Sequence, residues 1–246
     1  MVKGKGDTIH IPELANLTAT SKSADSDVTL SNPTEDVTDI SIDQHYHVAV
    51  KVEDMAAIQS QSDLRSEYTK KMGYALAKQL DTALLGVFSS WTTTDVGTYG
   101  VDVTDATLVA GILALDEGDV PDNNRYFVVK PSQKAALMKL DKFTAASYLG
   151  EMTQKSPIQT GPNNSRLWGD VYGIPVYYTN QITTTSATPT QTHNILFQKE
   201  AIALAMQLSP RTQAAPWLES LATLVVADTI YGYSVLRTDF GVEVRS

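Results

Sequence analysis

The sequence predicts an α+β fold whose largest elements are one long helix and an extended pair of strands. Residues 40–52 alternate apolar and polar side chains, as a strand with one buried face does. Residues 54–88 repeat apolar side chains at helical spacing. Residues 221–244 read as long strand segments, which we expect to be broken near Asp228 and Gly232. A chain of 246 residues can bury a sizeable core, in one large domain or two joined ones.

Composition excludes several classes of protein. The hydrophobic fraction of 42% and the charged fraction of 19% are ordinary for a folded chain and argue against intrinsic disorder. No apolar run approaches the roughly 20 residues that cross a membrane, and the first residues lack the apolar core of a signal peptide. The chain has no cysteine, which excludes disulfides, zinc–thiolate sites and thiol nucleophiles.

An antiparallel arm is expected near the N-terminus. Residues 7–17 form a short strand that Pro12 confines to an edge or a bend. Residues 18–36 are rich in Ser, Thr, Asp and Asn, a composition typical of a loop or hairpin tip. The strand over residues 40–52 then returns along the arm. Such an arm buries little of its own surface, so we expect it to lean on something else.

The arm is strongly acidic. The net charge of the chain is −9, and between Asp25 and Asp43 there is no Lys or Arg. That stretch holds six acids: Asp25, Asp27, Glu35, Asp36, Asp39 and Asp43. Such a surface repels phosphate, and the chain lacks the dense basic cluster of a DNA-reading protein. The arm either docks onto a basic patch of a protein partner or is a solvated loop that aids solubility.

The helix predicted over residues 54–88 is unusually long. At a rise of 1.5 Å per residue it would extend about 50 Å. That is about three times the usual helix length in a compact domain. The helix therefore has the dimensions of a strut.

The second half of the chain alternates short strands and helices around one long irregular segment. We expect a helix over residues 105–117, closed by Gly118 in the left-handed conformation. Pro131 opens a short helix that runs to about Leu140. The strands are expected at 125–130, 171–179 and 194–198, with an irregular stretch at 141–168, a polar hairpin or linker at 182–192, and an ambiguous segment at 199–207.

Catalytic motifs are mostly missing. The sequence has no phosphate-binding Gly-rich loop, no G-x-S-x-G and no H-E-x-x-H. The one candidate metal site is Asp43, His45 and His47, which share one side of a strand and are residue types that hold zinc or non-haem metals. His10 on the partner strand can approach them. The alternative interpretation is that the three residues simply form the solvent-exposed polar face of that strand.

The order of these elements resembles the major capsid proteins of tailed bacteriophages, of the Hong Kong 97 type. The segment GDTIHIP and the strand through Val52 resemble the extended E-loop, and Glu53 to about Val87 resembles the spine helix of the peripheral (P) domain. The segments TLVAGILAL, RYFVVKPSQKAALMKL and RLWGDVYGIPVYYTNQI resemble the axial (A) domain. The segments NILFQKEAIALAMQ and TLVVADTIYGYSVLRTDFGVEV resemble the closing strands. The likeness covers nearly the whole chain and lies in order and spacing.

The resemblance implies a domain layout and a function. The E-loop arm and its flanking strands would take residues 1–52, the P domain with the spine helix 53–100, the A domain 101–193, and closing strands shared by both 194–246. The chain would be a structural head protein that assembles into pentamers and hexamers of an icosahedral shell around double-stranded DNA. It would not be an enzyme. The alternatives are an encapsulin-like compartment shell of the same fold, or a metal-dependent enzyme using Asp43, His45 and His47.

The resemblance also implies partners and contact residues. The partners would be copies of the chain itself, with scaffolding, portal and cement proteins, and with enclosed DNA that is not read by sequence. No cofactor or membrane is expected, and the protein would lie in the virion after assembly in the host cytoplasm. The family usually has an N-terminal arm before the E-loop, whereas this chain enters its first strand within six residues. The expected contacts between subunits are Lys22, Asp25, Asp27, Glu35, Asp36, Asp39, Asn163, Asn164 and Arg166. Lys22 is the one lysine placed for a Lys–Asn crosslink, and we expect no such crosslink.

Overall fold

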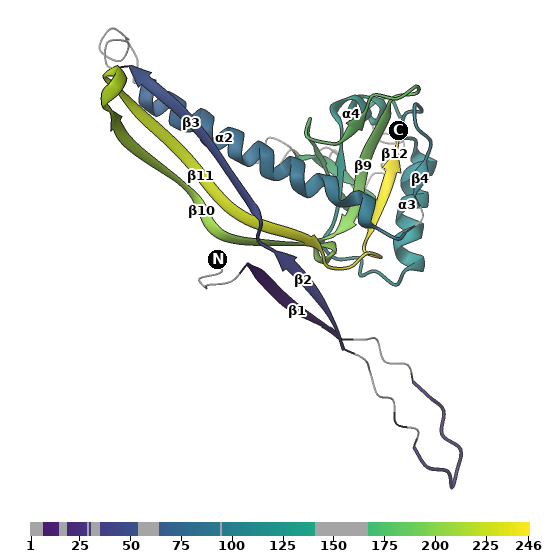
Figure 1. The fold of residues 1–246 in the computed structure, drawn as a ribbon. Coiled ribbons are helices and arrows are strands. Elements are labelled where there is room, and N and C mark those ends of the chain that lie inside the picture. Colours follow the sequence, from purple (N-terminus) through teal and green to yellow (C-terminus); the bar gives the residue numbers. More distant parts are fainter. Residues whose placement is uncertain are drawn as a thin grey trace.

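Three sheets and one long helix organise the part of the chain that the structure describes. The computed structural model describes residues 7–14, 19–28, 30, 35–53, 64–93, 95–140 and 167–246. The sheets are a two-stranded pair β1–β2, a three-stranded sheet in the order β10–β11–β3, and a seven-stranded sheet in the order β4–β12–β9–β5–β7–β6 with β8 beside β9. Figure 1 shows the pair β1–β2 leading away from the other two sheets. In the described part of the chain, no helix is both long and apolar enough to cross a membrane.

The arm begins as a regular antiparallel ladder. Strand β1 (Thr8–Leu14) pairs with β2 (Glu35–Ser41), and β3 (Gln44–Glu53) pairs instead with β11 (Ala222–Val235). The prediction of one strand over residues 40–52 is therefore wrong in its continuity. The chain bends after Ser41, where Gly232 lies so close that a Cβ there would overlap the Ser41 carbonyl. The predicted alternation is confirmed, because Ile40 and Val52 are both buried.

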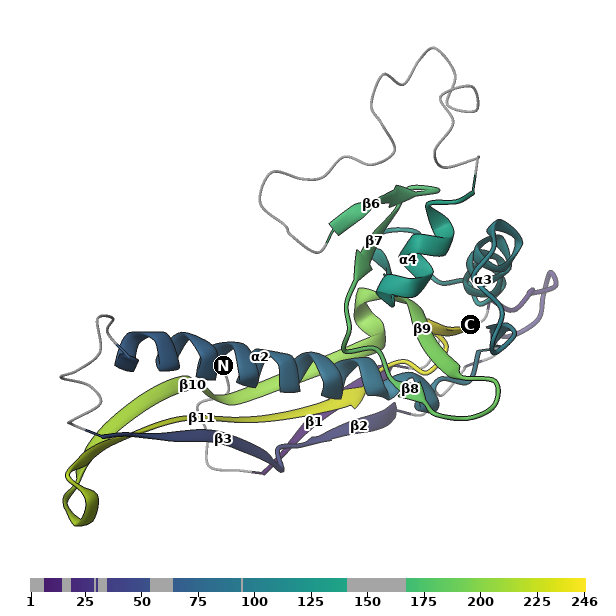
Figure 2. The ribbon, with the colours of Figure 1, turned by 90° about the horizontal axis from the view of Figure 1, so that it is seen from above.

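The long helix lies along one face of the three-stranded sheet. Helix α2 (Leu64–Leu85) is followed by the short 3-10 helix η1 (Gly86–Ser90), and Figures 1 and 2 show α2 running beside β3, β11 and β10 (Ile202–Trp217). Met72 and Leu76 are its buried anchors, and they pack on the side chains Val225, Ala227, Tyr46, Val48 and Val50. The predicted helix is confirmed from Leu64 onward, and its expected first turns at 54–63 lie outside the described residues.

The seven-stranded sheet carries the main core. Its strands are β4 (Val96–Gly97), β5 (Arg125–Val129), β6 (Leu167–Val171), β7 (Ile174–Tyr178), β8 (Thr184–Thr185), β9 (Gln191–Gln198) and β12 (Gly241–Arg245). Helices α3 (Asp105–Glu117) and α4 (Pro131–Leu137) pack on it and confirm the two predicted helices. Leu115, Leu137, Phe127, Val176 and Val242 lie at its centre and are 2% exposed or less.

Two local turns differ from the prediction because the left-handed residue is elsewhere. Gly118 follows α3 with φ of −83°, and Asp119 takes the left-handed conformation at φ 54°. The strand predicted at 171–179 is confirmed over Ile174–Tyr178 as β7, but its first residues form the turn of a hairpin with β6. Its turn is Tyr172–Gly173, with φ of 53° and 80°.

The last third of the chain is more extended than predicted. The ambiguous segment begins as the 3-10 helix η3 (Lys199–Ala201) and continues as the sixteen-residue strand β10. Strand β11 passes without a break through Asp228 and Gly232, so the predicted breaks there are wrong. Asp228 stays in the strand because it pairs with Arg211 on β10, directly opposite in the ladder. The expected irregular loop lies outside the described residues, except that residues 167–168 belong to β6.

Candidate assembly surfaces

The arm tip is an exposed surface that is both acidic and apolar. We define the arm tip as residues 19–28 with Leu30. Lys22, Asp25 and Asp27 are exposed there. Val28 is 68% exposed and Leu30 is 90% exposed. Apolar side chains this exposed gain stability only when another surface covers them.

The arm is anchored to its own subunit at its base. Ile40, Ile42 and Ala205 form a small buried cluster with Ile9 and Ile11 packed against it. On the outside of the same ladder, the His10 Nδ1 atom lies 2.5 Å from Asp39 Oδ1. Asp39 therefore already has a partner within the arm.

A second surface is the bare face of the three-stranded sheet. Tyr46 and Val48 point toward α2, so the alternating residues His45 and His47 lie on the opposite face. They line a groove of about 480 Å³, which we call the sheet-face groove. Its other lining residues are Arg211, Gln213, Ala214, Ala215, Leu224, Val226 and Asp228.

An ion pair organises the polar end of the sheet-face groove. Arg211 Nε donates to Asp228 Oδ1 at 2.9 Å, and its Nη2 donates to Oδ2 at 3.1 Å. This two-pronged hydrogen bond holds the pKa of Asp228 below its usual value, although partial burial acts in the opposite direction. His45 Nε2 lies 3.6 Å from the same carboxylate. The Arg211 side chain is 52% exposed, so the guanidinium also faces water.

The structure does not gather the candidate metal residues into one ligand set. His45 and His47 both line the sheet-face groove. The Asp43 side chain instead accepts a hydrogen bond from Gln44 Nε2 at 2.7 Å, and His10 pairs with Asp39. Among the described residues, no three His, Asp or Glu side chains form a metal-binding group. The metal hypothesis therefore gains no support.

Five of the predicted contact residues lie wholly or partly outside the described residues. Asn163, Asn164 and Arg166 are outside the described residues. Glu35 and Asp36 belong to β2, opposite Leu14 and Glu13, but their side chains are not described. The contact role of all these residues stays a prediction.

A third surface is an apolar groove between the end of α2 and the seven-stranded sheet. It has a volume of about 430 Å³. Leu84 and Leu85 contribute one wall, and Tyr126, Tyr177 and Phe197 contribute the other. The sequence did not indicate this groove, because its walls come from segments far apart in the chain.

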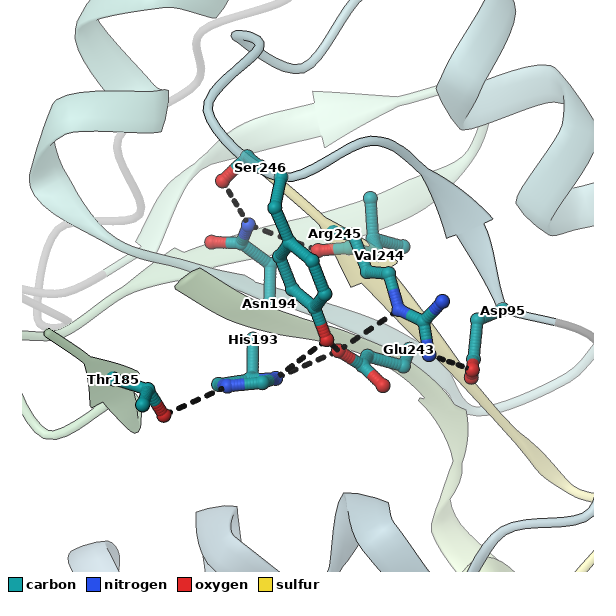
Figure 3. A network of polar contacts seen from close by, with 9 residues as sticks. Asp95, Thr185, His193, Asn194, Glu243, Val244, Arg245 and Ser246 are labelled. Atoms are coloured by element: carbon teal, nitrogen blue, oxygen red, sulfur yellow. Dashed lines mark hydrogen bonds and ion pairs between the residues drawn. The ribbon is translucent and has the colours of Figure 1, made fainter. Parts of the chain in front are cut away.

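A buried polar network fixes the joint between the long helix and the seven-stranded sheet. In Figure 3, His193 on β9 reaches Glu243 on β12, with 2.7 Å between His193 Nδ1 and Glu243 Oε1. Tyr99 donates to the same carboxylate at 2.8 Å. Phe88 of η1 stacks on the imidazole ring with 4.4 Å between ring centres. These contacts connect the segment that follows α2 to two core strands.

Charges around this network are partly balanced. Arg245 pairs with Asp95 and lies 3.4 Å from Glu243 (Figure 3). Burial, with the nearby Glu243 charge, raises the pKa of Asp95, although Arg245 opposes this. Burial and the hydrogen bond to Glu243 raise the pKa of the Tyr99 hydroxyl. The sequence analysis missed this network. Its one signal was Glu243, an acid between two valines of a strand that is otherwise apolar up to Arg245.

Comparison with known proteins identifies the family. Residues 35–245 match the family model described as "Phage capsid protein". The chain matches no curated protein sequence. Among solved structures, it is similar to one titled "Mycobacterium phage Che8", with 22% identity, a TM-score of 0.76, and coverage of 98% of this chain and 85% of the other.

Two further capsid structures agree. The chain is similar to "Capsid of Ralstonia phage GP4" at 12% identity and a TM-score of 0.74, covering 99% of this chain and 84% of that one. It is similar to "Capsid structure of the Cyanophage P-SCSP1u" at 19% identity and a TM-score of 0.70, covering 98% and 83%. The fold class and the resemblance inferred from the sequence are confirmed. The chain belongs to the phage capsid protein family and is a structural major capsid protein with the Hong Kong 97-type fold, a component of the virion shell.

Proposed function

We propose that copies of this chain form pentamers and hexamers, and that these close into an icosahedral shell around packaged double-stranded DNA. The observation that carries the proposal is the projecting arm, whose tip exposes Val28 and Leu30 to solvent. An isolated two-stranded ribbon is marginally stable in water. Covering the arm with neighbouring copies would supply the apolar contacts that its own subunit does not.

The energetics of such a shell are additive. Each subunit would bury several interfaces of modest size against its neighbours. Because every copy is tethered through more than one contact, losing one contact does not release the subunit. Weak individual contacts then produce a durable particle.

The proposed layout keeps the domain boundaries at 1–52, 53–100, 101–193 and 194–246. The net charge of −9 favours loose enclosure of DNA over tight or sequence-specific binding. Scaffolding, portal and cement proteins are the expected partners, with assembly in the host cytoplasm. A compartment shell that holds a protein cargo would share this fold. The contents of purified particles distinguish the two functions: packaged nucleic acid supports a capsid, and an enclosed protein supports a compartment shell.

The arm can be tested by deletion. Removing residues 18–36, with a short Gly–Ser loop leading into Val37 of β2, should leave the subunit folded, because the core clusters lie elsewhere. Shell yield measured by negative-stain microscopy should fall strongly, while the circular dichroism spectrum should match that of the intact chain. Normal yield and normal heat resistance of the deleted particles would contradict the role of the arm.

A further inference from the structure

We propose that the joint between α2 and the seven-stranded sheet has two positions. In the described position the apolar groove is open, and the stack of Phe88 on His193 holds it so. In the second position Leu84 and Leu85 pack onto the sheet and fill the groove. The inference goes beyond the proposed function, and only its consequence for shells rests on that function.

The joint connects two separately packed bodies. The first is α2 with the three-stranded sheet, and the second is the seven-stranded sheet with α3 and α4. Figures 1 and 2 show the three-stranded sheet along the length of α2 and the seven-stranded sheet at its end. The chain passes between the bodies through η1, through η3 into β10, and through residues 236–240. A change of backbone angle over these short segments would reorient one body relative to the other.

The lock is an aromatic stack on a fixed imidazole. Phe88 of η1 belongs to the first body, and His193 of β9 belongs to the second. Their rings are 17° from parallel. Glu243 contacts one ring nitrogen of His193, and Thr185 Oγ1 lies 3.4 Å from the other. The edge of Tyr99 meets the same ring with 5.4 Å between centres. These contacts orient the imidazole so that it presents its flat side to η1.

The apolar groove lies beside this lock. His193, Ile195 and Phe197 alternate along β9, so their side chains share one face of the sheet. Ile195 and Phe197 line the groove, and Leu84 and Leu85 form its opposite wall. The groove has a volume of about 430 Å³, so the last turn of α2 has room to approach the sheet.

The apolar lining favours closure of the groove, and the stack opposes it. Ile202 and Leu204 of β10 also line the groove, and Leu204 is 41% exposed. Burying such surface is favourable in proportion to its area. Leu85, however, directly precedes η1, so α2 cannot turn toward the groove unless Phe88 slides off the imidazole.

Trp91 supplies the pivot, because it ties the chain to the second body directly after η1. Its ring stacks on Phe197 with 6.3 Å between centres. A Cβ at Gly241 would overlap the same ring, so the backbone of β12 lies against it. The Thr92 N–H donates to the Thr238 carbonyl at 2.9 Å. The rotation therefore takes place over η1.

A distance measurement tests the two positions. The chain has no native cysteine, so Lys78→Cys on α2 and Met138→Cys after α4 place one spin label on each body, both at exposed residues. Phe88→Ala should shorten the mean distance between the labels by at least about 2 Å, because closure moves α2 toward the sheet. The matched variant Phe88→Tyr keeps the stack and should keep the distance. Labelled chains are diluted with unlabelled ones, so that only distances within a subunit are measured. A folded Phe88→Ala chain with an unchanged distance would overturn the inference.

A second pair of variants acts on the imidazole from the other side. Glu243→Ala removes the carboxylate that orients His193 and should shorten the distance as Phe88→Ala does. Glu243→Gln keeps an oxygen acceptor and should leave the distance unchanged. Val176→Ala is the control for general loosening, because Val176 is fully buried in the core of the same sheet. It should lower the melting temperature without moving the labels. An equal shift in this control would overturn the inference.

A charge in the groove tests what drives closure. Leu204→Glu places a carboxylate in the groove wall, and closure would bury that charge without a partner. Added to Phe88→Ala, it should return the distance to that of the unmodified chain. A distance that stays short in the combined variant would show that the groove does not drive the movement, and would overturn the inference.

The inference and the proposed function fail separately. Because the angle at the joint orients the two bodies, shells of the Phe88→Ala chain should differ in diameter from shells of the unmodified chain, and shells of Val176→Ala should not. If the unmodified chain forms no shells, the proposed function fails, and the distance within the subunit still decides the inference. If shells form and the distance does not move, the function stands and the joint has one position.

Discussion

Tyr231 is the largest fully buried side chain in the structure, at 1% exposure. Its ring stacks on Tyr46 with 5.9 Å between ring centres, and no described residue bonds its hydroxyl. Burial, with the neighbouring Tyr46 and Tyr233, raises the pKa of Tyr231 to about 12. The neutral hydroxyl is thus the form that the fold accommodates.

Replacing Tyr231 by Phe should keep the ring packing and remove an unpaired hydroxyl. The free energy of unfolding at pH 7 should stay the same or rise by up to about 1 kcal/mol. A raised tyrosine pKa stabilises the fold below the unfolded value near 10 and loses that contribution as the pH rises toward 12. Urea unfolding at pH 8, 10 and 11 should show a shallower alkaline loss in the variant. Parallel losses in both proteins would contradict this assignment.

Single residues also show which parts of the site could be predicted from the sequence alone. The polar side of the strand with His45 and His47 was predictable from alternation, because side-chain parity is a local property. Their neighbours Arg211 and Asp228 were not, because they come from β10 and β11. Pairing across strands depends on the tertiary fold. The sequence therefore indicated only the residues that β3 contributes to the sheet-face groove.

At the scale of elements, the buried side chains Met72 and Leu76 anchor α2 to the three-stranded sheet. Met72 is 1% exposed and Leu76 is 4% exposed, while Tyr74 on the other side is 61% exposed. Replacing Met72 by Ala should lower the free energy of unfolding by about 2–4 kcal/mol through lost burial and a cavity. The matched control Tyr74→Ala should change it by less than about 0.5 kcal/mol. Similar losses in the two variants, measured by urea unfolding, would mean that α2 is not anchored through this face.

The bend between arm and sheet depends on one glycine. A Cβ at Gly232 would overlap the Ser41 carbonyl, whereas a Cβ at Gly73 in α2 meets nothing within 4 Å. Gly232→Ala should therefore destabilise the subunit and displace the base of the arm. Gly73→Ala should stabilise the helix by about 0.5–1 kcal/mol. Thermal melts of the two single variants check this, and an unchanged melting temperature for Gly232→Ala would refute the close approach.

Elements with local signals were predictable, and those set by distant partners were not. The bounds of α3 follow from its apolar spacing and its Thr104 cap, whose side chain accepts a hydrogen bond from the Thr107 N–H. The break after Ser41 has no local signal, because it is imposed by Gly232 on β11. The length of β10 was missed for a similar reason. Its outer half is exposed and owes its conformation to pairing with β11.

At the scale of the whole molecule, the structure divides into a packed body and a reaching arm. The body has its own cores on the seven-stranded sheet and beneath α2. The arm has a core at its base only, as far as the described residues extend. The sequence predicted this division from the acidic, polar tip and the long helix. It could not predict the apolar groove or the His193–Glu243 network, since both join segments from different parts of the chain.

The central claim is that copies of the chain cover surfaces that a single copy leaves exposed. Electron microscopy of the purified chain at neutral pH tests it most directly. The account predicts closed particles of uniform size, in which density for residues 19–28 lies across the neighbouring subunit. A stable monomer in solution, with its arm packed against its own body, would contradict it.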